Sequence, residues 1–461
     1  MSDEAAPGAA SGSPAPGRAA PGGATFGGAT AGGATAGGAT AGGATAGSAT
    51  SGSATPGITG TSTSATADVF VVPGPIDTAT GGFRYDRRIV AELRAAGFAI
   101  DPLELAGDWP RPSAGDRARA EAVFATIADG TRVVVDGLAF GALPDLARRH
   151  GRRLRLVALV HHPLWLEEEP RSDEPTLDEP TLDEPTLDEP TLDEPTLDEP
   201  TLDEPRSGGA RRPPPGCAAA AAEIEALAHA RRVIVTSIDT AAAVALMGVA
   251  AERIAVVEPG CDPYPLARGS GGGPVRLLCV ATVTPRKGYL DLVAALADIE
   301  RALPGERRPA WRLDVVGSID RDRQHVRDVR AAIAAAGLGD RIRLVGEVDE
   351  DDLGHWYDGA DGMVLASHHE GYGMSLAEAL MHGLPVVATR AGAVAATVDG
   401  AARLVTVGDT AALATAIADG LLDAGGRAEL AAAAGRWRAT RLERANWTAA
   451  ARRFAAALAD V

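Results

Sequence analysis

Two glutamates eight positions apart, Glu370 and Glu378, are the side chains of this sequence that most clearly suggest a chemical role. An apolar run ends near Ala366, so we expect Glu370 just beyond a buried strand and Glu378 about one turn inside the next helix. Carboxylates accept hydrogen bonds from hydroxyl groups. One glutamate therefore suits the hydroxyls of a sugar, and the other suits those of a ribose. The alternative is a capped turn with two solvated glutamates.

The residues between these glutamates favour an anionic ligand. Gly371 and Gly373 let the backbone approach a ligand closely. Met374 and Ser375 stand at the expected helix start, where unpaired amides and the helix dipole attract phosphate oxygens. This spacing indicates a diphosphate that is bound between the two carboxylates.

Two adjacent cations, Arg286 and Lys287, stand where the first strand of a second strand series would meet its helix. A positive charge is needed there if a diphosphate is to leave without a metal ion. An ordinary charged loop is the alternative interpretation.

The first half of the chain adds weaker candidates. Gly82 follows the first apolar run and suits a glycine turn beside phosphate or sugar, although a plain turn explains it as well. His161 and His162 close another apolar run, and either one can reach a sugar hydroxyl or the acceptor. A zinc site would need further ligands, and no other ligand cluster supports one. A packed pair without function is the remaining alternative.

Strands that alternate with helices would position these residues. Apolar runs rich in Val, Ile and Leu begin at Val69, Val133, Leu154, Val233 and Ile254. After a glycine-rich break at 268–274, further runs lie at 275–281, 311–316, 341–345, 362–366 and 385–388. Continuous apolar strands between helices indicate parallel sheets covered on both faces. We therefore predict an α/β protein with two doubly wound, Rossmann-like domains that face a central cleft.

The domain boundaries follow from this pattern. Residues 67–265 would form an N-terminal domain, and residues 274–461 would form a C-terminal domain. A family resemblance, given below with the residues that carry it, implies the acceptor side for the first domain and nucleotide-sugar binding for the second. The last helix of the second domain can pack back on the first.

Two segments of low complexity interrupt the pattern. Residues 1–66 are mostly Gly, Ala, Ser, Thr and Pro, with little to bury, which predicts a disordered tail. From Thr176 to Pro205 the unit Thr-Leu-Asp-Glu-Pro recurs six times. A proline every fifth residue and repelling acids predict a disordered insert at about 167–215 rather than a stacked repeat.

The bulk composition narrows the partners and the compartment. The net charge is -18, and most of it belongs to the insert. No long basic run suggests a nucleic-acid partner. The three cysteines fit no zinc pattern and suit a reducing, cytoplasmic location. No run approaches the roughly 20 apolar residues of a membrane helix, and a peripheral membrane contact stays open.

Together these segments resemble the retaining, GT-B-fold glycosyltransferases of glycosyltransferase family 4, the "glycosyl transferases group 1" proteins. The resemblance runs from about Val69 to the C-terminus without the insert. The segments that carry it are the Glu370–Glu378 loop, Pro-Arg-Lys-Gly, Pro-Gly-Cys-Asp, Val-Val-Gly-Ser at 315–318 and Gly-Leu-Pro-Val-Val-Ala-Thr at 383–389.

This resemblance implies that a UDP- or GDP-sugar donates its sugar, with retention, to an unidentified small-molecule, lipid or glycan acceptor. It implies no metal or other cofactor, because the leaving phosphate accepts the acceptor's proton. The catalytic residues would be Glu370, Lys287 and His162. The donor-binding residues would be Gly82, His161, Arg286, Gly371, Gly373, Met374, Ser375 and Glu378.

Three features depart from the family pattern. Thr282 stands where an arginine is common, five positions before Lys287. Ala395 and Ala396 stand where Pro-Glu is usual, and the acidic insert follows Pro163 closely. Thr282 and Ala396 keep open a catalytically inactive protein that binds a nucleotide sugar. A second alternative is a nucleotide-sugar epimerase of GT-B fold, which would bind the same donor.

Overall fold

The computed structural model describes residues 67–167, 212–302, 310–459 and 461. All of them belong to one compact unit, residues 64–461. The predicted N-terminal tail and nearly all of the predicted insert lie outside the described residues.

The first half of this unit is a parallel sheet of six strands in the order β2-β1-β3-β4-β5-β6. The strands are β1 (Asp68–Val72), β2 (Ile100–Glu104), β3 (Arg132–Asp136), β4 (Arg155–Val160), β5 (Arg232–Val235) and β6 (Ile254–Val256). The helices are α1 (Gly81–Ala95), α2 (Ala114–Thr126), α3 (Gly137–Phe140), α4 (Pro144–His150), η1 (Leu164–Glu167), α5 (Ala218–Ala228), α6 (Ile238–Leu246) and η2 (Ala251–Arg253).

Both faces of this first sheet are covered, as its apolar strands require. Successive residues of a strand point to opposite faces, and Phe70 and Val71 of β1 accordingly enter different buried clusters. Phe124 of α2 packs in one cluster and Ile89 of α1 packs in the other. Local signals set the helix ends, such as the capping box at Ser113 that begins α2.

The second half is another parallel sheet, in the order β12-β11-β10-β7-β8-β9. Its strands are β7 (Val275–Val280), β8 (Trp311–Val316), β9 (Ile342–Gly346), β10 (Gly362–Leu365), β11 (Val386–Thr389) and β12 (Arg403–Val405). Its helices are η3 (Pro285–Lys287), α7 (Tyr289–Ala302), α8 (Arg323–Ala335), α9 (Glu350–Asp358), α10 (Met374–Met381), α11 (Val394–Val398), α12 (Thr410–Ile417) and η5 (Ala418–Leu422).

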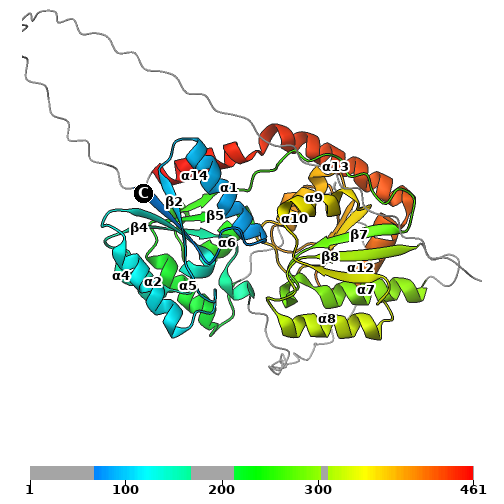
Figure 1. The fold of residues 1–461 in the computed structure, drawn as a ribbon, viewed down its shortest axis with the longest axis horizontal. Coiled ribbons are helices and arrows are strands. Elements are labelled where there is room, and N and C mark those ends of the chain that lie inside the picture. The colour runs from blue at the N-terminus through cyan, green and yellow to red at the C-terminus, as the bar shows by residue number, and fades with distance from the viewer. Residues whose placement is uncertain (1–66, 168–211, 303–309, 460) are drawn as a thin grey trace, which may run out of the picture. The chain divides into compact units, whose positions relative to one another are not determined.

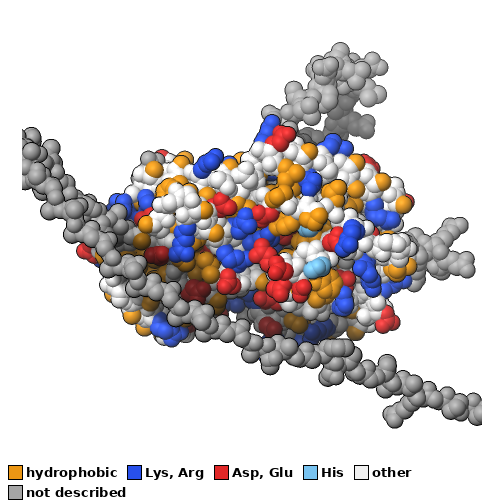
Figure 2. All heavy atoms as spheres, turned by 45° about the horizontal axis from the view of Figure 1, so that its top comes forward, with side chains coloured by type: hydrophobic (Ala, Val, Ile, Leu, Met, Phe, Trp, Pro, Cys, Tyr) orange, Lys and Arg blue, Asp and Glu red, His pale blue; other side chains and the backbone are white. Residues whose placement is uncertain are grey.

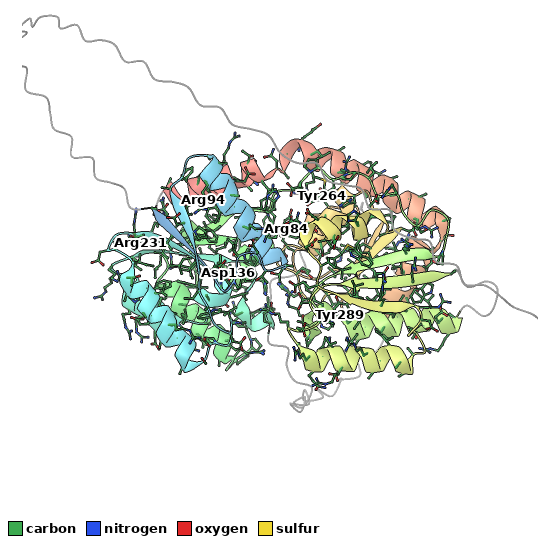
Figure 3. The ribbon with its side chains drawn as sticks, in the orientation of Figure 1. Arg84, Arg94, Asp136, Arg231, Tyr264 and Tyr289 are labelled. Atoms are coloured by element: carbon green, nitrogen blue, oxygen red, sulfur yellow. The ribbon has the colours of Figure 1, made fainter. Side chains whose placement is uncertain are left out.

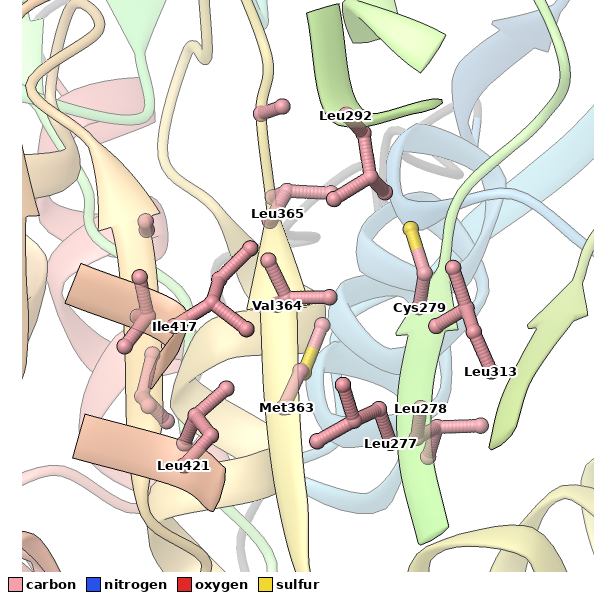
Figure 4. Packing of buried hydrophobic residues seen from close by; sticks show 14 of the residues in the cluster. Leu277, Leu278, Cys279, Leu292, Leu313, Met363, Val364, Leu365, Ile417 and Leu421 are labelled. Carbon is pink, nitrogen blue, oxygen red and sulfur yellow. The ribbon is translucent and has the colours of Figure 1, made fainter. Parts of the chain in front are cut away.

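The core of the second sheet is aliphatic. Leu277 of β7 and Val364 of β10 belong to one buried cluster with Leu292 of α7 and Leu421 of η5 (Figure 4). The strand order is that of a nucleotide-binding Rossmann fold, in which the order reverses between the first and fourth strands. Here that reversal lies between β7 and β10.

The last two helices are α13 (Ala424–Arg444) and α14 (Trp447–Ala459). α14 packs against α1 and β5 of the first sheet (Figure 1). Trp447 and Phe454 are buried there, and the Phe454 ring lies 6.2 Å from that of Phe70. Gly260 makes this crossing tight, because a Cβ added to it would lie 2.3 Å from the Trp447 nitrogen.

These two covered parallel sheets agree with the predicted α/β architecture, and the positions of most elements agree as well. Two edge strands, β2 and β12, have no counterpart among the predicted runs. β2 contains Asp101 and Pro102, which interrupt an apolar pattern. The predicted glycine turn before the first helix is wrong, because Gly81 and Gly82 are the first residues of α1 itself.

On the face drawn in Figure 2, Lys and Arg side chains are interspersed with Asp and Glu. Among the described residues, no helix is both long enough and apolar enough to cross a membrane. The cytoplasmic location remains a prediction.

Candidate active site

A cavity of about 490 Å³ lies at the carboxyl ends of the strands in both sheets. The loops after β7 and β10, on either side of the reversal in strand order, form one wall. The start of α1 and the residues that follow β3 and β4 form the other. Ligands of open parallel sheets bind at such a reversal, so the topology places this cavity where chemistry is expected.

Lys287 and Glu370 form an ion pair inside this cavity. The Lys287 Nζ lies 2.6 Å from Glu370 Oε1, and the Ser367 hydroxyl donates to the same oxygen at 2.6 Å. Burial would raise the pKa of Glu370, but the charges of Lys287 and Arg286 outweigh burial and lower it to about 2. Glu370 is therefore a fixed anion at neutral pH. Burial lowers the pKa of Lys287, and Glu370 opposes this.

Close backbone contacts hold the two loops of this pair together. The His368 amide donates to the Arg286 carbonyl at 2.8 Å. Gly288 ends η3 at a φ of 63°, and a Cβ there would lie 2.0 Å from the Ala366 carbonyl oxygen. Only glycine permits both the left-handed backbone and this approach.

A second group links the two halves of the chain through Glu167. Its Oε1 lies 2.5 Å from His162 Nε2 and 3.2 Å from Arg286 Nη2. Burial would raise the pKa of Glu167, but Arg286 and His162 hold it well below its usual range. Burial and Arg286 lower the pKa of His162. Glu167, assigned from the sequence to the start of the insert, thus ends η1 inside the cavity.

His161 belongs to a third, more buried group. Its Nε2 lies 3.1 Å from Asp86 Oδ1 and 3.2 Å from Asp136 Oδ2. Burial would lower the pKa of His161, but hydrogen bonds from its ring to Asp136 and Asp86, and their charges, raise it to about 10. Gly82 leaves room for this ring, because a Cβ there would meet His161 Cδ2 at 3.3 Å.

Glu378 has partners from both halves of the chain. Arg84 of α1 donates to its Oε1, and Tyr357 of α9 donates to its Oε2 at 2.9 Å. Arg84 also donates to the Tyr264 hydroxyl (Figure 3). It lies 3.2 Å from Glu350 Oε1. Burial raises the pKa of Glu378, while Arg84 and Tyr357 oppose this shift.

Two helices begin side by side at the cavity. Met374 and Ser375 are the first residues of α10, after Gly373 with its left-handed φ of 90°. A Cβ added to Gly81, the first residue of α1, would lie 3.7 Å from the Met374 Cβ. The first amides of a helix have no acceptor within it, so these two helix starts direct unpaired amides and positive dipole ends to one place.

Every residue predicted for the site lines this cavity: Gly82, His161, His162, Arg286, Lys287, Glu370, Gly371, Gly373, Met374, Ser375 and Glu378. Their roles toward a ligand remain predictions. Thr282 also lines the cavity. The sequence interpretation missed the partners of these residues, namely Arg84, Asp86, Asp136, Glu167 and Tyr357. The sequence could have indicated Asp136 as a site residue, because it ends an apolar strand in the same way that His161 follows one.

Residues 274–423 match the family model described as Glycosyl transferases group 1. The chain is similar to the 2-deoxystreptamine N-acetyl-D-glucosaminyltransferase of Streptomyces fradiae, with 34% identity over 49% of this chain and 56% of that protein. It is also similar to D-inositol 3-phosphate glycosyltransferase 2 of Catenulispora acidiphila, with 33% identity over 42% of this chain and 48% of that protein. The chain thus spans about half the length of the curated relatives it matches.

Two solved structures share the architecture. Sucrose-phosphate synthase from Thermosynechococcus elongatus aligns with a TM-score of 0.63 and 20% identity, over 86% of this chain and 98% of that one. Anabaena HepE in complex with UDP and glucose aligns with a TM-score of 0.59 and 17% identity, over 85% and 99%. At these identities the likeness establishes the fold alone. The described chain therefore has the predicted GT-B fold, and its residues 274–423 match the Glycosyl transferases group 1 model.

Proposed function

We propose that this protein is a retaining glycosyltransferase of family 4 that transfers a sugar from a nucleotide-diphosphate sugar to an acceptor. The observation that carries the proposal is the Lys287–Glu370 ion pair, at 2.6 Å, beside the start of α10. A cation, an anion and a row of unpaired amides in one cavity match the phosphate and the sugar hydroxyls of such a donor.

The diphosphate would lie at a phosphate site, by which we mean the starts of α1 and α10 together with Arg286, Lys287 and His161. Two helix dipoles and three cationic side chains there would stabilise the negative charge that develops as the sugar leaves. This charge makes a metal ion unnecessary in our proposal. The leaving phosphate would then accept the acceptor's proton.

Lys287 is the only lysine in the sequence. All other basic positions are arginine or histidine. An ammonium is compact and can rotate its three donors, whereas a guanidinium is a larger planar fork. In a buried pair at 2.6 Å, the smaller group can hold Glu370 and still turn toward a phosphate oxygen.

The two glutamates would bind the two sugars of the donor. Glu370, held as an anion, would accept from hydroxyls of the transferred sugar. Glu378 would accept from the ribose hydroxyls, since each of its oxygens retains a lone pair beside its contact with Arg84 or Tyr357. His162, whose pKa is lowered, would act as a neutral donor or acceptor near the reacting sugar.

The names of similar proteins give more support for the class of donor than for the identity of the acceptor. HepE has been solved with UDP-glucose, and a similar protein from Xanthomonas oryzae is named as a GDP-mannose-dependent mannosyltransferase. We therefore propose a UDP- or GDP-sugar. The acceptors named for the relatives are an aminocyclitol and an inositol phosphate, and a small molecule, a lipid or a glycan fits the proposal. None of the relatives named above is an epimerase.

The first test is a thermal-shift screen with UDP-, GDP- and ADP-sugars. A ligand that binds only the folded state raises the melting temperature by mass action, so a hit identifies the donor. Transfer of the sugar should then be lost in Glu370→Ala and in Lys287→Ala, while both variants remain folded. Arg301→Ala is the matched control, because Arg301 lies on α7 outside the cavity and pairs with Asp298. Wild-type transfer in either cavity variant would overturn the proposal.

A further inference from the structure

The least expected feature of the cavity is that two buried carboxylates approach one imidazole nitrogen. Asp86 is fully buried on α1, and Asp136 is 2% exposed at the end of β3. Both reach His161 Nε2, at 3.1 and 3.2 Å. These are hydrogen-bond distances, so one N–H of the His161 ring can be shared between the two acids.

Buried acids need compensation, and here His161 supplies it. An isolated carboxylate would be costly in this position. The second oxygen of Asp86, Oδ2, is buried and has no hydrogen-bond partner among the described residues. Burial and the charge of Asp136 raise the pKa of Asp86 to about 7. The charge of a protonated His161 ring opposes this rise in the pKa of Asp86 and compensates the charge of the two acids.

Among the described residues, the other contacts of His161 contribute no further carboxylate. The Tyr85 ring of α1 lies edge-on, with 5.3 Å between ring centroids. His162 follows in the chain, and Thr236 and Thr240 donate to the His161 carbonyl oxygen at 3.2 Å. Among these contacts, Asp86 and Asp136 alone favour a charged ring.

His161 lies where a donor diphosphate would need positive charge. Its ring is beside Gly82 at the start of α1, and its carbonyl oxygen is 2.0 Å from where a Gly371 Cβ would stand. Both glycines border the phosphate site. Thr282, which lines the same cavity, carries no charge.

We propose that Asp86 is a positioning residue that, together with Asp136, keeps His161 as a fixed cation at the phosphate site. This inference rests on the proposed function for the identity of the anion, but not for the charge of His161. Asp86 itself would not touch the donor. It would act through the imidazole, which then contributes its charge to nucleotide binding at any physiological pH.

The direct test is a titration of the His161 ring by NMR on histidine-labelled protein, with its signal identified by its loss in His161→Gln. In the wild type the ring should stay protonated up to about pH 10. In Asp86→Asn, which keeps the shape of the side chain, the midpoint should fall by about two pH units. Asp136→Asn should shift it in the same direction. An unchanged midpoint in Asp86→Asn would overturn the proposal, as would a divalent metal found bound in the purified protein.

A second measurement tests whether nucleotide binding uses this charge. The affinities for UDP and GDP are measured at about pH 7 and at about pH 9. In Asp86→Asn, His161 should lose its proton within this range. Asp86→Asn should lose up to about tenfold more affinity over this range than the wild type. Asp314→Asn, a carboxylate change in β8 outside the cavity, should behave as wild type. Parallel pH profiles in wild type and Asp86→Asn would refute the role at the phosphate site. If the wild type binds no nucleotide, the proposed function fails, while the NMR titration still decides the charge of His161.

Discussion

Arg84 forms an ion pair with Glu378, a residue 294 positions later in the chain. Both side chains are only 12% exposed. Arg84 belongs to the helix that follows the first strand of the first sheet, and Glu378 belongs to the helix after β10 of the second. The carboxylate that we propose for the donor's ribose therefore also ties the two sheets together. Donor binding and the junction of the two halves are consequently linked through one side chain.

The strength of this junction can be measured with a double-mutant cycle. Arg84→Ala should lower the free energy of unfolding by about 3 kcal/mol, because it leaves buried carboxylates without their cation. Glu378→Gln alone should cost less. The two changes together should cost about 1 to 2 kcal/mol less than their sum, since both remove the same pair. Urea unfolding of the four proteins gives this coupling energy.

Arg94→Ala is the control for that cycle. Arg94 lies further along α1 and pairs with Asp101 at 2.8 Å, outside the charge network of Glu378. Its effect should therefore add to that of Glu378→Gln. Additivity in the Arg84 cycle as well would mean that the Arg84–Glu378 pair contributes nothing to folding.

The fold was largely predictable because local patterns determine it. The apolar run at 311–316 corresponds residue for residue to β8, Trp311–Val316. The helix after Gly373 begins at Met374, one of the two residues predicted for its start. β2 escaped prediction for a physical reason: an edge strand makes few apolar contacts and tolerates Asp101 and Pro102.

The site was predictable only in part, because spacing reveals which residues share a loop and not which loops meet. Glu370 and the residues after it could be placed together from the sequence alone. Asp86 looks like an ordinary charge on a helix, and only the packing of α1 against the end of β4 brings it to His161. Glu167 is the first of a long series of acids in the sequence, and nothing local distinguishes it from those that follow.

Lys287 should not be replaceable by arginine. Lys287→Arg keeps the charge but introduces a larger, planar group into a buried pair that is only 14% and 9% exposed. We expect nucleotide affinity to fall by at least about tenfold despite the retained charge. Calorimetric titration with the best nucleotide from the thermal-shift screen measures this, with Lys287→Met as the variant that lacks the charge. Wild-type affinity in Lys287→Arg would show that charge alone matters at this position.

Glu223 should make stability fall with rising pH. This α5 carboxyl is fully buried and accepts from the Leu164 amide at 2.8 Å, and burial raises its pKa to about 8 from 4.5. The folded state therefore holds this proton more tightly than the unfolded state. The resulting stabilisation is fully present below pH 4.5 and is lost as pH rises through about 8. On this basis we expect a loss on the order of 3 kcal/mol across that window.

The measurement is urea unfolding at pH 4.5 and pH 8, the two ends of that window. In Glu223→Gln the difference between the two pH values should shrink, because the titrating group is gone. Glu225→Gln, an exposed position on the same helix that pairs with Arg148, should keep the wild-type difference. An equal pH dependence of stability in wild type and Glu223→Gln would show that Glu223 is not its cause. The result also bears on the cavity, since Leu164 begins η1 and Glu167 ends it.

Gly371 should be intolerant of even one added methyl group. A Cβ at this position would lie 2.0 Å from the His161 carbonyl oxygen and 3.2 Å from the His162 Cβ. Gly371→Ala must therefore push the loop after β10 away from the end of β4. We expect a loss of stability of about 1 to 3 kcal/mol, together with loss of the thermal shift produced by a nucleotide, because both walls of the phosphate site move.

At another glycine of the same fold, we expect an added methyl group to stabilise the protein. Gly435 lies inside α13, and a Cβ there would meet nothing within 4 Å. Gly435→Ala should raise stability by about 0.5 to 1 kcal/mol through helix propensity and leave the nucleotide shift intact. If Gly371→Ala instead binds nucleotide as the wild type does, the contact between the Gly371 loop and His161 does not shape the site, and the proposed phosphate site must be placed elsewhere in the cavity.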